Sequence, residues 1–419
     1  MRAVRPGVRE RLGALHERDF RLLFGATIVT TFGDAVATIA LTFAVLRTLH
    51  GSATQLGIVL AVRLVASSVV LLAGGVLSDR VPRHLVIVGA SVVQGGAQTA
   101  TAALLLSGHG SIAALAFLQV LYGVGDGFVL PAEVGLVPQT VTPERLQQAN
   151  ALQGMSRNVV YVVGPAIGGA LVVAGSPGFA IAVDAASFFV CALVLARIRI
   201  APLERAESPS FLHELCEGWR EFASRTWLWS TVVLFGVGNV FFMFWTVLGP
   251  TVVNARLGDG GPRAWTEIVV ASGLGALVGG AVALRYRPAR PLVACIVTPA
   301  TFPLQLLALA FAAPVWLVAA AAFASGMGIA VHLALWFTIF QQEVPEHARS
   351  RVSSYDMLGS FVLNPLGAAI AGPVAAGIGT KGALLLAVAV IGALNVVMLL
   401  IPSVWSIRRH PAATTMAAV

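Results

Sequence analysis

Apolar stretches long enough to cross a lipid bilayer recur along this sequence, and they constrain its fold more than any other feature. A transmembrane helix needs about 20 mostly apolar residues. Only 11 % of the residues are charged and 57 % are hydrophobic, whereas an average soluble domain has about 25 % charged and about 45–50 % apolar residues. A soluble enzyme and a disordered chain are therefore excluded. We expect an all-α membrane protein with twelve transmembrane helices, at roughly residues 20–48, 53–77, 85–107, 112–138, 150–175, 179–197, 227–250, 265–284, 292–313, 315–341, 352–378 and 382–402.

The basic residues predict the orientation of these helices. With the N-terminus inside, 21 basic residues fall on the inner side and 4 on the outer side. Positively charged loops stay in the cytoplasm, so we expect both termini there and the chain in a bacterial plasma membrane. The net charge of +8 is then a topology signal, and no nucleic-acid partner is expected. The basic N-terminus is expected to be retained, because the first apolar stretch is too long for a cleaved signal peptide.

One connection is long and divides the predicted helices into two sets of six. Within it, Phe211, Leu215, Trp219 and Phe222 stand at helical spacing, which predicts an amphipathic helix on the inner membrane surface. We therefore expect an N-terminal six-helix half at residues 1–197, a cytoplasmic linker at 198–226 and a C-terminal six-helix half at 227–419.

The two halves resemble each other at an offset of about 205 residues. Gly33-Asp34 corresponds to Gly238-Asn239, and Arg80 corresponds to Arg285. A duplicated six-helix unit is typical of secondary transporters, whose substrate site lies near the middle of the membrane at the repeat interface. We therefore expect a transporter with two pseudo-symmetric halves, in which Asn239 is the repeat-related partner of Asp34.

The connection after the second predicted helix carries the most specific motif. Residues 75–84 read GVLSDRVPRH, which resembles the loop motif G-x-L-A/S-D-R-x-G-R-R of the major facilitator superfamily. Pro82 and His84 are the departures from it. The resemblance covers nearly the whole chain and implies that family's twelve-helix fold and its transport function. It also implies a gating motif in which Asp79 contacts the start of the eleventh helix and stabilises the outward-open state; the motif residues are Gly75, Asp79, Arg80 and Arg83.

Other stretches resemble particular branches of the same family. The chain resembles the macrolide-efflux and enterobactin-exporter branch of drug:proton antiporters in three stretches taken together: Gly33-Asp34, residues 143–150 and residues 184–188. Gln119 stands where the family often has an arginine linked to proton coupling. The core of an antiporter-type motif, G-P-x-x-G-G, is matched by Gly164, Pro165, Gly168 and Gly169.

Charged side chains inside the predicted helices are few. A charge near the bilayer centre costs about 2.5–3.5 kcal/mol on insertion scales, so each requires a partner or a function. At 1.5 Å per residue, Asp34 and Arg63 lie about 21 and about 15 Å from the outer ends of adjacent helices, and we expect them to meet. Either Asp34 is a substrate or proton site influenced by Arg63, or the two form a structural ion pair. Asp126 is the second acidic candidate, with a structural pair to Arg157 as its alternative.

Aromatic side chains indicate a class of substrate. We expect Phe241 and Trp245 in the seventh helix and Trp336 in the tenth to line a cavity, with lipid-facing aromatics as the alternative. Aromatic walls with one or two carboxylates suit bulky, hydrophobic or amphipathic compounds. We therefore predict a monomeric, proton-coupled antiporter that exports a drug, an antibiotic or a siderophore-like molecule and that contributes to multidrug resistance. No cofactor is expected, because the sequence has no nucleotide-binding motif.

Two other functions are considered. An importer or facilitator of a small solute would have a polar lining rich in Asn, Gln and Trp, which is not evident. An intramembrane aspartyl protease is suggested by GVGD at 123–126 and YD at 355–356, but those proteases have the two motifs in the opposite order and a P-A-L motif that is absent here. The three cysteines have no metal-type spacing, so no metal site is expected.

Overall fold

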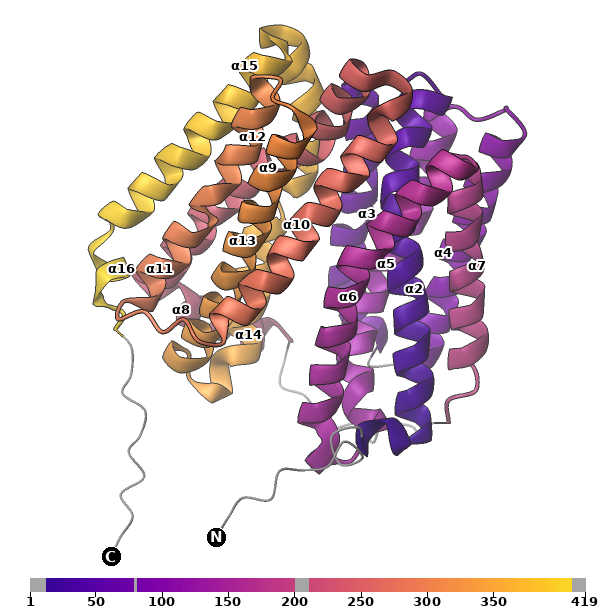
Figure 1. The fold of residues 1–419 in the computed structure, drawn as a ribbon. Coiled ribbons are helices and arrows are strands. Elements are labelled where there is room, and N and C mark those ends of the chain that lie inside the picture. The colour runs from indigo at the N-terminus through magenta and orange to yellow at the C-terminus, as the bar shows by residue number, and fades with distance from the viewer. Residues whose placement is uncertain (1–12, 79–80, 200–210, 409–419) are drawn as a thin grey trace, which may run out of the picture. The chain divides into compact units, whose positions relative to one another are not determined.

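The computed structural model describes residues 13–78, 81–199 and 211–408, and all regular structure among them is helical (Figure 1). The predicted all-α membrane fold is confirmed. The long helices of the N-terminal part are α2 (Arg18–Phe43), α3 (Ala53–Ser78), α4 (Arg83–Leu106), α5 (Ile112–Thr140), α6 (Leu146–Ala174) and α7 (Pro177–Leu195). The C-terminal part contains α8 (Phe211–Ala223), α9 (Thr226–Leu257), α10 (Gly261–Ala283), α11 (Pro291–Val297), α12 (Phe302–Ala310), α13 (Val315–Glu343), α14 (Glu346–Phe361), α15 (Asn364–Leu400) and α16 (Pro402–Ser406).

Ten stretches of helix in the described part of the chain are long and apolar enough to cross a membrane. Two of them, Thr226–Ala283 and Arg351–Leu400, are 58 and 50 residues long. Each is more than twice as long as the roughly 20 residues that one crossing needs. The ten stretches therefore accommodate the twelve predicted spans.

Two of the predicted spans are interrupted rather than continuous. The ninth is divided into α11 and α12 by the 3-10 turn Thr298–Thr301. The eleventh is divided where α14 ends and α15 begins, with Pro365 in the first turn of α15. Proline has no N–H to donate, so it fits the first turn of a helix and interrupts a longer one. Farther along α15, Gly379 has a φ of 78° and marks a kink between two helical parts, a conformation that favours glycine.

The helices pack into two compact units. The first consists of Met1–Ala206, Thr246–Val270 and Pro365–Gly377, and the second of Glu207–Trp245, Ala271–Asn364 and Ile378–Val419. This division follows packing, whereas the predicted halves follow the sequence repeat, and the halves stay a prediction.

In the first unit, glycines bring α5 close to α3. A Cβ on Gly123 would collide with the carbonyl oxygen of Arg63, and a Cβ on Gly127 would lie 2.7 Å from the carbonyl oxygen of Ser67. Small residues at a helix interface allow the two backbones to approach closely. As a result, the side chain of Arg63 is held against α5.

In the second unit, the linker helix α8 packs against α14. The rings of Trp219 and Phe222 lie 5.5 and 5.8 Å from the ring of Tyr355. Nη1 of Arg351 is 2.7 Å from a carboxylate oxygen of Glu217. The predicted helix is therefore present, and part of its apolar face is covered by protein; the side chains of Phe211 and Leu215 lie outside the description.

Candidate functional site

Asp34, Arg63 and Asp126 gather around one tyrosine of α5. Asp34, on α2, accepts a hydrogen bond from the hydroxyl of Tyr122. The guanidinium of Arg63, on α3, lies 4.1 Å from the centre of the Tyr122 ring. Nη2 of Arg63 is 3.6 Å from Oδ2 of Asp126. The structure thus brings the three predicted residues together. It corrects the expected pairing, because Arg63 forms its ion pair with Asp126 rather than with Asp34.

The close packing of α3 on α5 explains this arrangement. It sets Arg63 beside the turn of α5 that carries Tyr122 and Asp126, so the arginine meets these residues first. Tyr122 is fully buried, and its ring packs edge-on against Phe188 of α7 at 5.6 Å. A buried tyrosine hydroxyl needs a hydrogen-bond partner, and Asp34 supplies it.

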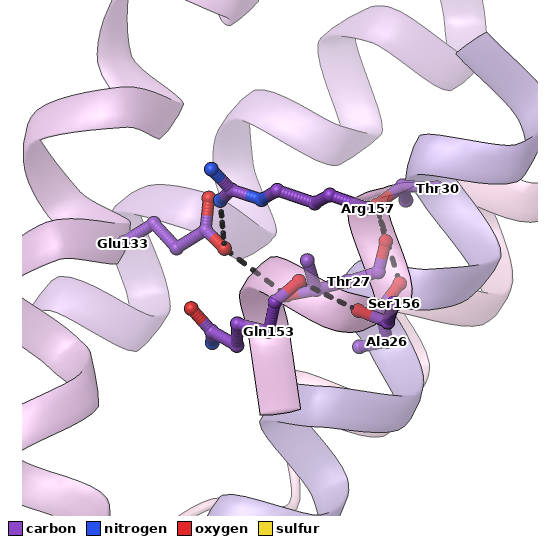
Figure 2. A network of polar contacts seen from close by, with 7 residues as sticks. All are labelled: Ala26, Thr27, Thr30, Glu133, Gln153, Ser156 and Arg157. Carbon is purple, nitrogen blue, oxygen red and sulfur yellow. Dashed lines mark hydrogen bonds and ion pairs between the residues drawn. The ribbon is translucent and has the colours of Figure 1, made fainter. Parts of the chain in front are cut away.

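A second carboxylate–arginine pair lies in the same unit (Figure 2). Nη2 of Arg157, on α6, is 2.9 Å from Oε1 of Glu133, on α5. The hydroxyl of Thr27, on α2, lies 3.4 Å from the same oxygen. The predicted alternative partner of Arg157 was Asp126, and that prediction is wrong because Glu133 takes the arginine.

Glu133 is the functional candidate that the sequence analysis missed. It follows Asp126 by seven residues, about two turns of helix, so the two carboxylates lie on the same face of α5. That spacing was visible in the sequence. Glu133 is 9 % exposed, and its buried charge is compensated by Arg157.

One cavity of about 220 Å³ in the first unit is lined by the carboxylates of Asp34, Asp126 and Glu133 and by Arg157. Ligand pockets are typically about 300–1,000 Å³, so this cavity fits a substituent or a few waters rather than a whole drug-sized molecule. Gln94 is 2 % exposed, and its side-chain oxygen has no hydrogen-bond partner in the described structure. The polar lining residues are Thr27, Thr30, Thr31, Asp34, Ser91, Gln94, Asp126, Glu133 and Arg157. In the described residues no group of three or more His, Cys, Asp or Glu side chains is placed to hold a metal ion.

Two stretches that carry the family resemblance contact each other beside this cavity. Asp184, on α7, is fully buried and accepts a hydrogen bond of 2.6 Å from Nε2 of Gln98. A Cβ on Gly33 would collide with Asp184 and Ser187. Glycine at position 33 therefore allows α2 to pack on the buried carboxylate of α7, which leaves the next residue, Asp34, beside Tyr122.

The antiporter-type motif lies on α6 and packs mainly against α2. A Cβ on Gly168 would lie 2.9 Å from Cα of Val36, and one on Gly164 would collide with Cβ of Ala35. A Cβ on Gly169 would collide with the side chain of Thr266, and Pro165 stands inside the helix. The motif therefore sets the distance between α6 and α2, the helices that carry Arg157 and Asp34.

The predicted gating motif is only partly described. Asp79 and Arg80 lie outside the described residues, and Gly75 lies within α3. Arg83 is the first residue of α4, and a Cβ on Gly135 of α5 would collide with its guanidinium. The role of the motif stays a prediction.

In the second unit, the predicted polar and aromatic residues have protein partners. Nδ2 of Asn239 donates to the carbonyl oxygen of Ser360 at 2.8 Å. Nε1 of Trp336 donates to Oδ2 of Asp356 at 3.0 Å. Trp336 belongs to the hydrophobic core of this unit, so the structure packs it among side chains rather than on the wall of an open cavity. Trp245 is buried, and Phe241 is half-buried with its ring 5.3 Å from that of Phe244.

Comparison with known proteins agrees with this fold. Enterobactin exporter EntS of Citrobacter koseri is 24 % identical over 367 residues, covering 83 % of this chain and 85 % of that protein. The enterobactin exporter EntS of Escherichia coli O1:K1 is 26 % identical over 368 residues with the same coverage.

Solved structures of transporters are similar in fold at low identity. A bacterial homologue of the human lysosomal transporter Spinster, in an inward-facing and unoccupied conformation, gives a TM-score of 0.71 at 14 % identity and covers 94 % of this chain and 99 % of that one. The nucleoside transporter NupG gives 0.69 at 11 %, covering 91 % and 98 %. The family model of the Major Facilitator Superfamily matches residues 23–363. This chain therefore belongs to the Major Facilitator Superfamily, whose members are membrane transporters and not enzymes.

Proposed function

We propose that this transporter exports a hydrophobic or amphipathic small molecule by alternating access, driven by proton entry. The observation that carries the proposal is the cavity on which three carboxylates meet, those of Asp34, Asp126 and Glu133. Ionisable groups inside a membrane span mark substrate or proton pathways. The enterobactin exporters at 24–26 % identity support efflux as the direction. A bacterial inner membrane, cytoplasmic termini, a monomeric state and a multidrug range belong to the same proposal.

Among the three carboxylates, Asp34 is the proposed proton carrier. Asp126 and Glu133 each have an arginine within 4 Å. A proton on either of them would leave a half-buried arginine with less compensation. Asp34 receives its hydrogen bond from a neutral hydroxyl, so its protonation breaks no direct ion pair. Asn239, its repeat mate, does not ionise and cannot replace it.

The test uses purified protein in proteoliposomes with an imposed pH gradient, with enterobactin and a lipophilic dye as substrates. Asp34→Asn is expected to abolish gradient-driven export while exchange down a substrate gradient continues. Full gradient-driven export by this variant would refute the assignment to Asp34. Wild-type transport in the inward direction, indifferent to the pH gradient, would instead indicate a facilitator.

The same preparation separates a functional from a structural role for the arginine. If Arg63→Ala unfolds the protein and adding Asp126→Asn restores folding, the Arg63–Asp126 pair is structural. If Arg63→Ala folds normally and changes the pH range of export, the arginine influences the carboxylate cluster. Expression and thermal unfolding in detergent are measured for each variant.

A further inference from the structure

Three arginines in the connection between α10 and α11 have no anionic partner in the part of the chain that the structure describes. Arg285, Arg287 and Arg290 are exposed, and none forms a salt bridge with any described residue. The sequence has no acidic residue from 268 to 342. Among the described residues, therefore, no acidic side chain neutralises their positive charge.

The short helix α16 supplies an ordered aromatic surface beside them. The guanidinium of Arg290 lies 4.9 Å from the ring centre of Trp405, and Nε1 of Trp405 donates to the carbonyl oxygen of Leu399 at 2.7 Å. Val404 and Ile407 are buried in the same core cluster as Leu292 of α11, and α11 and α16 lie side by side (Figure 1). Arg290 is thus positioned by an aromatic ring rather than by an anion of the described residues, so its charge can still bind an anionic ligand.

Exposed apolar side chains border this basic surface. Leu284, directly before Arg285, and Leu400, at the end of α15, are each 74 % exposed. Tyr286 and Trp405 are 42 % and 41 % exposed, and such aromatic side chains favour the membrane–water interface. A ligand that fits both surfaces has an anionic head and an apolar tail.

We propose that Arg285, Arg287, Arg290 and Trp405 form a binding site for the headgroup of an anionic phospholipid, with the acyl chains against Leu284 and Leu400. Arginine binds phosphate through paired N–H donors, and basic clusters next to transmembrane helices attract anionic lipids. The arginine bias places the site on the cytoplasmic side. The inference depends on membrane insertion and not on the proposed export function.

The test is native mass spectrometry of the full-length protein with phosphatidylglycerol or phosphatidylcholine. The wild-type protein is expected to retain phosphatidylglycerol at least about fivefold more than phosphatidylcholine. Arg287→Gln/Arg290→Gln should lose this preference. The matched control is Arg197→Gln/Arg199→Gln, which removes two exposed arginines that have no ion pair or ring contact in the described structure, and it should keep the preference.

Trp405 distinguishes a built site from general positive charge. Trp405→Phe should keep the preference for phosphatidylglycerol, because a ring still supports Arg290, and Trp405→Ala should reduce it. Equal retention by wild type and Arg287→Gln/Arg290→Gln, or equal loss in the Arg197→Gln/Arg199→Gln control, would overturn the proposal. Displacement of the lipid by millimolar inorganic phosphate would also overturn it, since it would identify a phosphate site rather than a lipid site.

Discussion

Two glycines of α6 make a matched test of the helix packing that positions the carboxylate cluster. A Cβ added at Gly168 would lie 2.9 Å from Cα and 3.0 Å from the carbonyl oxygen of Val36 on α2. A Cβ added at Gly154, on the same helix, meets nothing within 4 Å. Gly168→Ala and Gly154→Ala are therefore the same substitution on one helix, with and without a steric conflict.

The expected magnitudes follow from this geometry. Non-bonded carbon atoms prefer separations of about 3.5–4.0 Å, so Gly168→Ala must push α6 from α2 by about 0.6–1 Å. The obstructing atoms are backbone atoms, which cannot rotate away. Overpacking of this kind costs about 1–3 kcal/mol, and the gain in helix propensity from Gly to Ala returns about 1 kcal/mol. Gly154→Ala has only the gain, so the two variants should differ by about 1–3 kcal/mol.

The assay is equilibrium unfolding in mixed detergent micelles, followed by export in proteoliposomes. Gly168→Ala is expected to be less stable than Gly154→Ala and to export more slowly, because the helices that carry Asp34 and Arg157 are moved apart. Equal unfolding midpoints for the two variants would refute the inferred close contact of α6 and α2. Normal stability with lost export would indicate that the motif acts on transport alone.

Two further predictions concern polar contacts. Glu133→Gln should lower the free energy of unfolding by about 1 kcal/mol, because Arg157, which is half-exposed, loses its charged partner. A double-mutant cycle with Arg157→Gln should measure a coupling free energy of about 0.5–1 kcal/mol between the two residues. A coupling of zero would contradict the ion pair. Trp336→Phe should lower the free energy of unfolding by about 1–3 kcal/mol, because the buried Asp356 carboxylate loses its indole donor. The control is Trp316→Phe, on the same helix at a 70 % exposed position, and it should leave the free energy of unfolding unchanged. Equal effects of the two tryptophan variants would refute that hydrogen bond's contribution.

The helices themselves could be predicted because a bilayer requires about 20 apolar residues per crossing. The interruptions within them could not. Residues 361–363 before Pro365 and 366–371 after it are mostly apolar, so composition alone gave a single span. Whether a proline bends a transmembrane helix or begins a new one depends on how neighbouring segments satisfy the freed backbone groups.

The site was predictable in its members but not in its pairing. Asp34, Arg63 and Asp126 were identified because a charge in the membrane is costly. Depth along a helix gave no information on which side of the helix each residue faces, so the sequence paired Arg63 with Asp34. The structure pairs it with Asp126, and Tyr122 joins the cluster. A phenol in a hydrophobic helix carries no charge signal, which is why Tyr122 was missed.

The sequence repeat also conceals a chemical difference between the two halves of the chain. Gly33 is sterically required, because α2 packs there on the buried Asp184 and Ser187. Its repeat mate Gly238 has only a Leu394 methyl carbon near a hypothetical Cβ, at 3.9 Å. The residues that directly follow these two glycines also differ from each other. Asp34 is ionisable and lines a cavity, whereas Asn239 is neutral and its amide is bonded to a main-chain carbonyl. The predicted repeat therefore pairs an ionisable residue, Asp34, with a neutral one, Asn239. Gly238→Ala should accordingly be tolerated and Gly33→Ala should not, and a protein in which both are tolerated equally would show that the close packing beside Asp34 is not what holds the carboxylate in place.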